Sequence, residues 1–282
     1  MFGKLFEQLT KLRHNALSDK KQLWSALRKV YRTLLKVTPR WTVSKMIGPY
    51  GPFKLDRYFA FSNFEKWGTR HNKGFQASIE ASRGKSCVLD IGAHIGLVSM
   101  PMSRVVAPSG TVYAFEPAEV NRGLLMQHLS DNKISNVVVL PCLVGESTQD
   151  EVPFFEEEQP SGLPSIVVVK NSDQFRQTSK KQVTLDSVCA EHDILPEVIK
   201  IDVEGAELGV LTGGSKIIKQ AQPQIYLSIH PKHIAKLGSS LDELRLLIEQ
   251  MGYDCLTIDG DPVAEFRRDE YLLQPKKMAQ ET

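Results

Sequence analysis

The sequence predicts an α/β fold in which a mostly parallel β-sheet is covered by helices on both faces. From Ser86 onward, short apolar runs of strand length alternate with segments of helical periodicity. Fully apolar strands separated by helices are typical of a parallel sheet that is buried on both sides. Polar and acidic residues also recur where these runs end, and ligands bind at that edge of such sheets.

The start of the chain differs in charge from the remainder. Residues 1–45 contain eleven Lys and Arg but only two acids, Glu7 and Asp19, although the net formal charge of the chain is +2. Residues 22–36 place apolar side chains at three- and four-residue spacing with basic residues largely on other faces, which predicts a basic amphipathic helix. Such a helix could lie on an anionic membrane surface, contact a polyanion, or cover the catalytic domain with its apolar side.

Residues 41–83 are rich in aromatic side chains interrupted by glycine and proline, and their pattern assigns no clear element. This segment could form a lid over a pocket or pack on the edge of the sheet. We therefore divide the chain into a basic helical extension with a candidate lid at 1–83 and a catalytic domain at 84–282.

Six strands are predicted from the apolar runs: Cys87–Ile91, Thr111–Phe115, Val137–Leu140, Val198–Ile201, Gln224–Ile229 and Tyr253–Ile258. After the third strand, GESTQDEVPFF predicts a hairpin or a short edge addition rather than a helix. Near the C-terminus, YDCLTIDGDPV followed by EYLLQPK predicts an antiparallel pair at the end of the sheet.

Composition limits the class of protein. The four cysteines show no CxxC or Cys/His metal spacing, which predicts reduced, buried thiols in a reducing compartment. No apolar run approaches the ~20 residues of a membrane span, and the start breaks into charges too early for a secretory signal. We expect a cytoplasmic protein, with peripheral membrane contact through the basic helix as an alternative. The ordinary charge balance predicts no sequence-specific nucleic-acid partner.

The turn at Val88–Gly96, VLDIGAHIG, is the first candidate site. A strand ends in Asp90, Gly92 and Gly96 follow, and a helical pattern begins at Ile95. Gly92 lets the backbone approach a ligand closely, and the helix start offers free N–H groups. The dinucleotide fingerprint requires a third glycine where this chain has His94, so the turn predicts a nucleotide-type ligand without the strict dinucleotide pattern.

Glu116 ends the second strand, beside this turn. A carboxylate offers two acceptor oxygens and can bind both hydroxyls of a ribose. His230 closes the fifth strand, and an imidazole near its ordinary pKa is a common proton acceptor at neutral pH. His233 is expected to be solvated.

A cluster of three acids follows the fourth strand in KIDVEGAELG. Asp202, Glu204 and Glu207 could bind a metal, act as a general base, or contact a cationic part of a cofactor. One of them could instead cap the helix that starts near Ala206. The metal question stays open at this point.

The motifs VLDIGAHIG, AFEP, VTLDSV and VIKIDVEGAELGVLTGG, followed by a strand that closes in a histidine, resemble the FkbM family of S-adenosylmethionine-dependent methyltransferases. The resemblance runs from about Gly84 to the C-terminus, and KIDVEGAE is its specific part. It implies a class I (Rossmann-like) fold with a seven-stranded sheet, S-adenosylmethionine as methyl donor, and O-methylation of hydroxyls on sugars or natural products.

The resemblance also implies residue roles. Asp90, Gly92 and Gly96 would form the cofactor loop, with His94 where the family often has Asn, and Glu116 would hold the ribose. Asp202 and Glu204 would line the reactive end. After the third strand, where the family often has an acid near the adenine, this chain has Cys142 and Leu143, which we include in the cofactor site.

The resulting hypothesis is methyl transfer to a hydroxyl of a sugar, glycan or natural-product-like small molecule, with Asp202, Glu204 and His230 as catalytic residues and a divalent metal as an open question. Two alternatives remain: an NAD-dependent Rossmann oxidoreductase, which the same turn and acid permit, and a non-catalytic membrane-surface binding protein.

Overall fold

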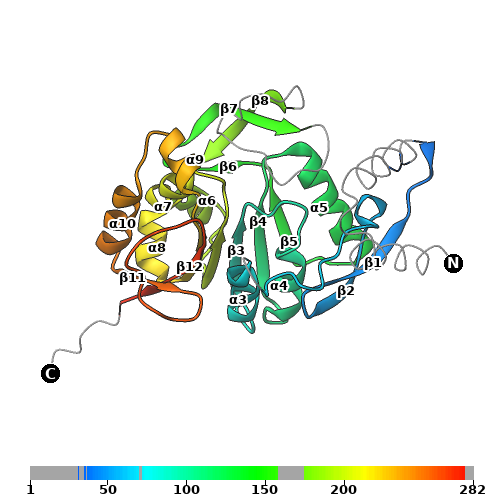
Figure 1. The fold of residues 1–282 in the computed structure, drawn as a ribbon, viewed down its shortest axis with the longest axis horizontal. Helices are drawn as coiled ribbons and strands as arrows, with labels where there is room; N and C mark the ends of the chain where they lie inside the picture. Colours follow the sequence, from blue (N-terminus) through cyan, green and yellow to red (C-terminus); the bar gives the residue numbers. More distant parts are fainter. Residues whose placement is uncertain (1–30, 32–34, 36, 70–71, 158–174, 277–282) are drawn as a thin grey trace, which may run out of the picture.

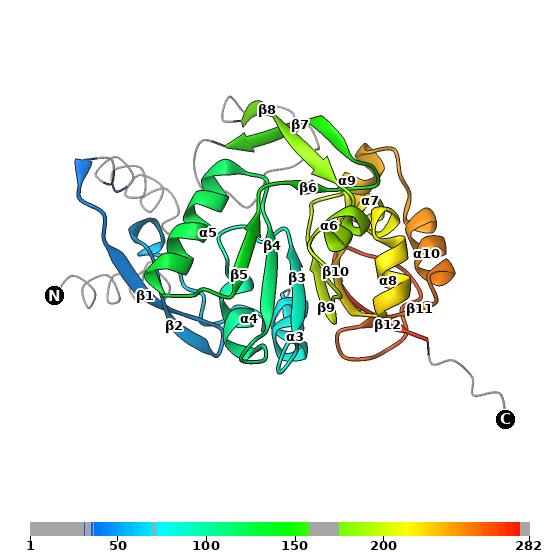
Figure 2. The same cartoon turned by 180° about the vertical axis from the view of Figure 1, so that it is seen from behind.

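The structure of the protein is a computed structural model that describes residues 31, 35, 37–69, 72–157 and 175–276 (Figures 1 and 2). In chain order its elements are β1 (Thr42–Ile47), β2 (Tyr50–Asp56), η1 (Arg57–Phe59), α3 (Lys73–Ala81), β3 (Cys87–Ile91), α4 (Ser99–Val105), β4 (Thr111–Phe115), α5 (Glu119–Asp131), β5 (Val137–Leu140), β6 (Leu143–Val144), β7 (Gln149–Glu157), β8 (Phe175–Val183), α6 (Leu185–Glu191), β9 (Val198–Ile201), α7 (Glu207–Gly213), α8 (Ser215–Ala221), β10 (Gln224–Ser228), α9 (Pro231–Lys236), α10 (Leu241–Gln250), β11 (Tyr253–Thr257) and β12 (Glu270–Pro275).

The main sheet has seven strands in the order β11-β12-β10-β9-β3-β4-β5. The five strands from β10 to β5 pair in parallel, and β12 runs antiparallel to both of its neighbours, β10 and β11. This architecture confirms the predicted class I methyltransferase fold. It also confirms the antiparallel pair predicted near the C-terminus.

Helices cover both faces of this sheet, because successive side chains of a strand point to opposite sides. Leu89 and Ile199 lie in a buried cluster with residues of α6, α7, α8 and α10. Their neighbours Val88 and Val198 lie in a second cluster with residues of α3 and α4. The apolar strands are therefore buried on both sides, as their composition predicts.

The predicted strand boundaries agree with the structure to within one residue, but one predicted helix start is wrong. The helix after β3 begins at Ser99 and not at Ile95. Gly92, His94 and Gly96 have φ values of +84°, +52° and +91°, which no right-handed helix contains. The residues between β3 and α4 thus form an irregular turn with three positive φ values instead of the first turn of a helix.

The described part of the N-terminal extension contains a β-hairpin, which the sequence pattern did not reveal. β1 and β2 pair antiparallel, and β2 packs against α5 at one side of the molecule (Figure 2). The amphipathic helix predicted at residues 22–36 lies outside the described residues except for Tyr31 and Leu35. Tyr31 donates a hydrogen bond of 2.7 Å to the carbonyl of Arg57 and packs edge-on against Phe61.

His128 of α5 connects this hairpin to the turn after β3. The ring is fully buried. Its Nε2 accepts the N–H of Asp56 at 2.9 Å, so Nδ1 carries the proton that faces the carbonyl of Ile95, also at 2.9 Å. Burial lowers the pKa of His128, which keeps the ring neutral and both hydrogen bonds intact.

A separate three-stranded sheet, β6-β8-β7, follows β5 in the chain. β7 and β8 pair antiparallel, but β8 begins only at Phe175, so GESTQDEVPFF contributes a single strand and is neither a hairpin by itself nor an addition to the edge of the main sheet. The prediction of extended structure rather than a helix there is confirmed. Both views show β7 and β8 at the top of the molecule (Figures 1 and 2).

The start of β12 contacts a helix from the other end of the chain. The buried carboxylate of Glu270 accepts a hydrogen bond from the backbone N–H of Gly74, in the first turn of α3. This bond satisfies one of the N–H groups that a helix start leaves without an intrahelical partner.

All four cysteines are free thiols: Cys142 and Cys189 are buried, and Cys87 and Cys255 are half-buried. The predicted burial thus holds for Cys142 and Cys189, and the reduced state and the compartment stay predictions. Across the described ranges, no helix combines the length and the apolar character that a membrane span requires.

Candidate active site

A cavity of about 430 Å³ lies at the carboxyl ends of β3, β4 and β9. Its lining includes the turn after β3, Glu116 after β4, Cys142 and Leu143 after β5, and Asp202 and Glu204 after β9. The volume falls within the range of about 300–1,000 Å³ that is usual for small-molecule pockets. The parallel sheet therefore presents its ligand-binding edge to a cavity of suitable size.

The turn after β3 is fixed by its backbone. The N–H groups of Gly92 and Ala93 both donate to the carbonyl of Phe115, at 3.0 and 2.9 Å. A Cβ on Gly92 would lie 1.9 Å from the carbonyl oxygen of Asp202, so only glycine fits between the two strand ends. Gly96 is restricted mainly by its φ of +91°, because a Cβ there would meet only the end of the Leu125 side chain, at 2.6 Å.

Asp90 lies beneath this turn and does not line the cavity. Its side chain is fully buried, its Oδ1 lies 3.0 Å from Nζ of Lys200, and its Oδ2 accepts a hydrogen bond from Ser99. Lys200 also donates to the carbonyl of Gly92 at 2.8 Å. Burial lowers the pKa of Lys200, but the charges of Asp90, Asp202 and Glu116 together outweigh it and leave the pKa above its usual value. Asp90 thus contacts the turn through Lys200 and the first residue of α4 through Ser99.

Glu116 lines the cavity and is bound to the same turn. Its Oε2 accepts the N–H of His94 at 2.7 Å and its Oε1 accepts the N–H of Ala118 at 2.9 Å. Burial raises the pKa of Glu116 to about 7, although both N–H bonds act in the opposite direction. The carboxyl group therefore changes its charge near neutral pH, and each oxygen keeps a lone pair for a further donor.

The aromatic segment of the extension contributes to the cavity wall. Phe59, Phe64, Trp67 and Phe75 all line it. Phe59 also belongs to the buried cluster that joins the hairpin to α5. The segment thus packs against α5 and lines the cavity, and its role as a lid stays a prediction.

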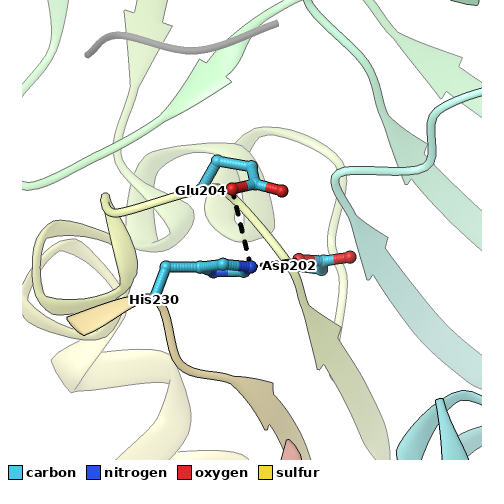
Figure 3. A group of neighbouring side chains, drawn as sticks. All are labelled: Asp202, Glu204 and His230. Carbon is cyan, nitrogen blue, oxygen red and sulfur yellow. Dashed lines mark ion pairs between the residues drawn. The ribbon is translucent and has the colours of Figure 1, made fainter. Parts of the chain in front are cut away.

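Asp202, Glu204 and His230 come together at the end of β9 and β10 (Figure 3). Their ligand atoms lie within 4.8 Å of one another. The Nε2 of His230 is 3.7 Å from Oδ1 of Asp202 and 3.6 Å from Oε2 of Glu204. β9 and β10 are neighbouring parallel strands, which explains why groups 28 residues apart in the sequence share one site.

The other ring nitrogen of His230 is held by Glu207. Nδ1 lies 2.7 Å from Oε1 of this carboxylate, which is fully buried and also accepts the N–H of Gly205 at 3.0 Å.

The prediction that His233 is solvated is wrong: its side chain is 27% exposed and its Nδ1 lies 3.1 Å from Glu204. Because α9 begins directly after His230, the first turn of this helix brings His233 against the carboxylate of Glu204.

The acidic surroundings change the pKa values of this cluster. Burial lowers the pKa of His230, but the hydrogen bond with Glu207 and the charges of Glu204 and Asp202 outweigh it, so the pKa lies above its usual value. Burial raises the pKa of Glu204, which the histidines oppose. The carboxylates around His230 therefore favour its protonated form more than water would.

The sequence predicts neither Lys200 as a site residue nor the pairing of Glu207 with His230. Lys200 is the one charged residue in the apolar strand VIKI, which pairs with the strand that carries Asp90. A charged residue in a buried strand needs a partner of opposite charge, and this rule could have pointed to Lys200. Glu207 was recognised as one of three acids, but its partner His230 lies 23 residues away and no spacing rule connects them.

Comparison with known proteins agrees with this geometry. Residues 90–255 match the methyltransferase FkbM domain, which is more than half of the 282-residue chain. Methyltransferase 1 of Beauveria bassiana is 23% identical over 146 residues, covering 45% of this chain and 58% of that protein. Hexuronic acid methyltransferase AglP of Haloferax volcanii is 27% identical over 201 residues, covering 68% of this chain and 78% of that protein.

Among solved structures, a methyltransferase FkbM from Methylobacillus flagellatus is 21% identical, with a TM-score of 0.44, over 68% of this chain and 44% of that one. This chain thus spans little more than half the length of the Beauveria bassiana relative and less than half of the solved chain. The matched domain contains the turn after β3, Glu116 and the whole Asp202, Glu204 and His230 cluster. The chain therefore belongs to the FkbM methyltransferase domain family.

Proposed function

We propose that this protein transfers a methyl group from S-adenosylmethionine to a hydroxyl oxygen of a sugar or a similar polyhydroxylated small molecule. One observation supports the proposal most strongly. The same cavity is lined by Glu116, an acid placed to bind the ribose of a nucleoside, and by the two acids Asp202 and Glu204. These groups lie on opposite sides of β3, because β4 and β9 are its two neighbours in the sheet.

The residues present fit the methyl donor. The second lone pairs of Glu116 are free to accept ribose hydroxyls, and the irregular turn brings backbone close to the ligand. A turn without the third glycine suits one nucleoside with a short charged tail better than a pyrophosphate. When bound, S-adenosylmethionine supplies an electrophilic methyl carbon on a sulfonium.

The opposite part of the cavity suits a hydroxylated acceptor. Asp202 and Glu204 offer acceptor oxygens for hydroxyl groups, and the rings of Phe64 and Trp67 offer apolar surfaces for the flat face of a sugar. The name of the Haloferax volcanii relative, a hexuronic acid methyltransferase, supports an acceptor of this class.

The protein's contribution to the reaction is alignment and removal of one proton. In-line placement of the acceptor oxygen, methyl carbon and sulfur can provide most of the rate enhancement. Transfer of the methyl group to the acceptor oxygen would leave the C–S electron pair on sulfur, so the acceptor hydroxyl would also have to lose its proton. We assign the hydroxyl proton to Asp202, which lines the cavity, or to His230, whose Nε2 lies 3.7 Å from Oδ1 of Asp202.

Calorimetric titration tests the donor site first. We expect S-adenosylhomocysteine to bind saturably to the full chain and NADH not to bind. NADH binding would instead support an oxidoreductase. Absence of binding by either ligand would contradict the proposal and favour a non-catalytic protein.

The affinity for S-adenosylhomocysteine is expected to rise with pH because of Glu116. With a pKa of about 7, its carboxyl group is mostly neutral at pH 6 and mostly ionised at pH 8, and only the ionised form offers its full set of acceptors to the ribose. We expect about tenfold tighter binding at pH 8 than at pH 6. The Glu116→Gln variant should bind weakly with no such rise. A wild-type affinity that is independent of pH would contradict this role.

The reactive cluster is tested by turnover. Asp202→Asn and His230→Ala are each expected to lower the rate of methyl transfer by about 10²–10⁴-fold while leaving S-adenosylhomocysteine affinity within a small factor. Transfer of labelled methyl groups to uronic acids and their glycosides provides the measurement. Asp259→Asn, at an exposed acid paired with Lys73, is the matched control and should keep full activity. Full turnover by either cluster variant would show that the assignment is wrong.

A further inference from the structure

The cluster after β9 and β10 has the composition of a cation site. Asp202, Glu204 and His230 bring two carboxylates and one imidazole to a point beside the cavity (Figure 3). Carboxylate oxygens suit Mg²⁺ and Mn²⁺, and a single imidazole nitrogen is accepted by Mn²⁺ and the later divalent ions.

The distances favour ligands around a shared ion over direct hydrogen bonds. Nε2 of His230 is 3.7 Å from Asp202 and 3.6 Å from Glu204, beyond the 2.7–3.2 Å of an N–H···O bond. Ligands of an octahedral ion with bonds of about 2.1 Å lie about 3.0 Å apart when adjacent and about 4.2 Å apart when opposite. The observed separations lie between these two values, so the side chains would approach each other by roughly 0.7 Å to bind one ion as adjacent ligands.

Glu207 gives a second, independent observation. A metal-binding histidine commonly donates its other ring N–H to a carboxylate, which fixes the ring and directs the free lone pair at the metal. Here Nδ1 faces the fully buried Glu207 at 2.7 Å, and Glu207 is itself held by the N–H of Gly205. The edge of the ring that carries Nε2 is thereby turned toward both carboxylates (Figure 3).

We propose that Asp202, Glu204 and His230 bind one divalent cation of the Mn²⁺ type, with Glu207 as the residue that orients His230. Asp202 and Glu204 line the cavity, so the open side of the ion faces the ligand space. There it would hold the acceptor hydroxyl next to the donor methyl. This last role rests on the proposed function, whereas cation binding does not.

Binding of Mn²⁺ to the full chain, after chelator treatment and without any methyl donor, tests the site. The loss of the free Mn²⁺ electron paramagnetic resonance signal measures affinity. Modulation of the electron spin echo by a coordinated nitrogen reports the imidazole. We expect one saturable site with nitrogen modulation, and competition by Mg²⁺.

Variants locate the ion. Asp202→Asn and Glu204→Gln should abolish saturable binding, and His230→Ala should also remove the nitrogen modulation. Glu207→Gln should weaken binding about 10–100-fold, as expected for a residue that orients a ligand. Asp259→Asn is the control and should bind as the wild type does. Circular dichroism confirms that each variant is folded.

Two results would overturn the inference: no saturable binding at millimolar Mn²⁺, or equal affinity in the wild type and the cluster variants. Either result would make the cluster an ion-pair network between imidazolium and carboxylates. Failure of the cation site is distinguishable from failure of the proposed function. In the first case S-adenosylhomocysteine still binds, and in the second Mn²⁺ binds but the nucleoside does not.

Discussion

Gly92→Ala is expected to abolish S-adenosylhomocysteine binding and to lower the free energy of unfolding by about 3 kcal/mol or more. The alanine Cβ would lie 1.9 Å from the carbonyl oxygen of Asp202 and 3.0 Å from its carbonyl carbon. Both are backbone atoms at a strand end, so no side-chain rotation relieves the contact. The turn after β3 or the Asp202 segment must move, and each lines the cavity.

Gly84→Ala is the matched control for this variant. Gly84 also has positive φ, +70°, but a Cβ there meets no atom within 4 Å. It therefore measures the conformational cost alone, about 1–2 kcal/mol. Urea denaturation gives the stabilities and calorimetry the affinities. Equal losses in the two variants would show that the contact with Asp202 does not limit the turn.

Lys200→Met is expected to destabilise the fold by about 3–5 kcal/mol. The substitution removes the cation that faces Asp90 at 3.0 Å and leaves a carboxylate that is fully buried. It also removes the donor to the carbonyl of Gly92. Neutralising the acid as well, in Lys200→Met with Asp90→Asn, should recover part of the loss, because no uncompensated charge then remains.

Lys85→Met provides the comparison for an exposed pair. Lys85 and Glu197 lie 3.2 Å apart, and both side chains are 39% exposed. Solvent screens such pairs, so the expected loss is at most about 1 kcal/mol. Urea denaturation of the wild type, the two Lys200→Met variants and Lys85→Met measures these losses of stability. A loss of similar size at both lysines would mean that burial of the Lys200 and Asp90 pair adds nothing.

The sequence predicts the central sheet well because its strands are buried on both faces. Strands such as VIKI and CVLDI are apolar on both faces, so they stand out in the sequence as continuous apolar runs. Each run ends where polar residues or glycine follow, and this sets the strand boundary. The parallel order then brings Glu116, Asp202 and His230 to one edge. These are the parts of the site that follow from topology alone.

The parts that escaped prediction depend on contacts between distant segments. The hairpin β1–β2 is stabilised by apolar packing on α5 and by His128, and neither leaves a periodic pattern in residues 41–83. The pairing of Glu207 with His230 depends on the juxtaposition of α7 and β10. The late start of α4 depends on three residues with positive φ, Gly92, His94 and Gly96, and at His94 no glycine in the sequence indicates this conformation.

The position of β12 has a consequence for how the chain folds. This strand is the last one described, yet it lies inside the sheet, between β10 and β11, and its first residue, Glu270, holds the first turn of α3. Until residues 270–275 are available, β10 and β11 have no common partner and α3 lacks that bond. The sheet therefore cannot close progressively from the N-terminus during synthesis, and its completion waits for contacts across almost 200 residues, the kind of long-range pairing that slows folding.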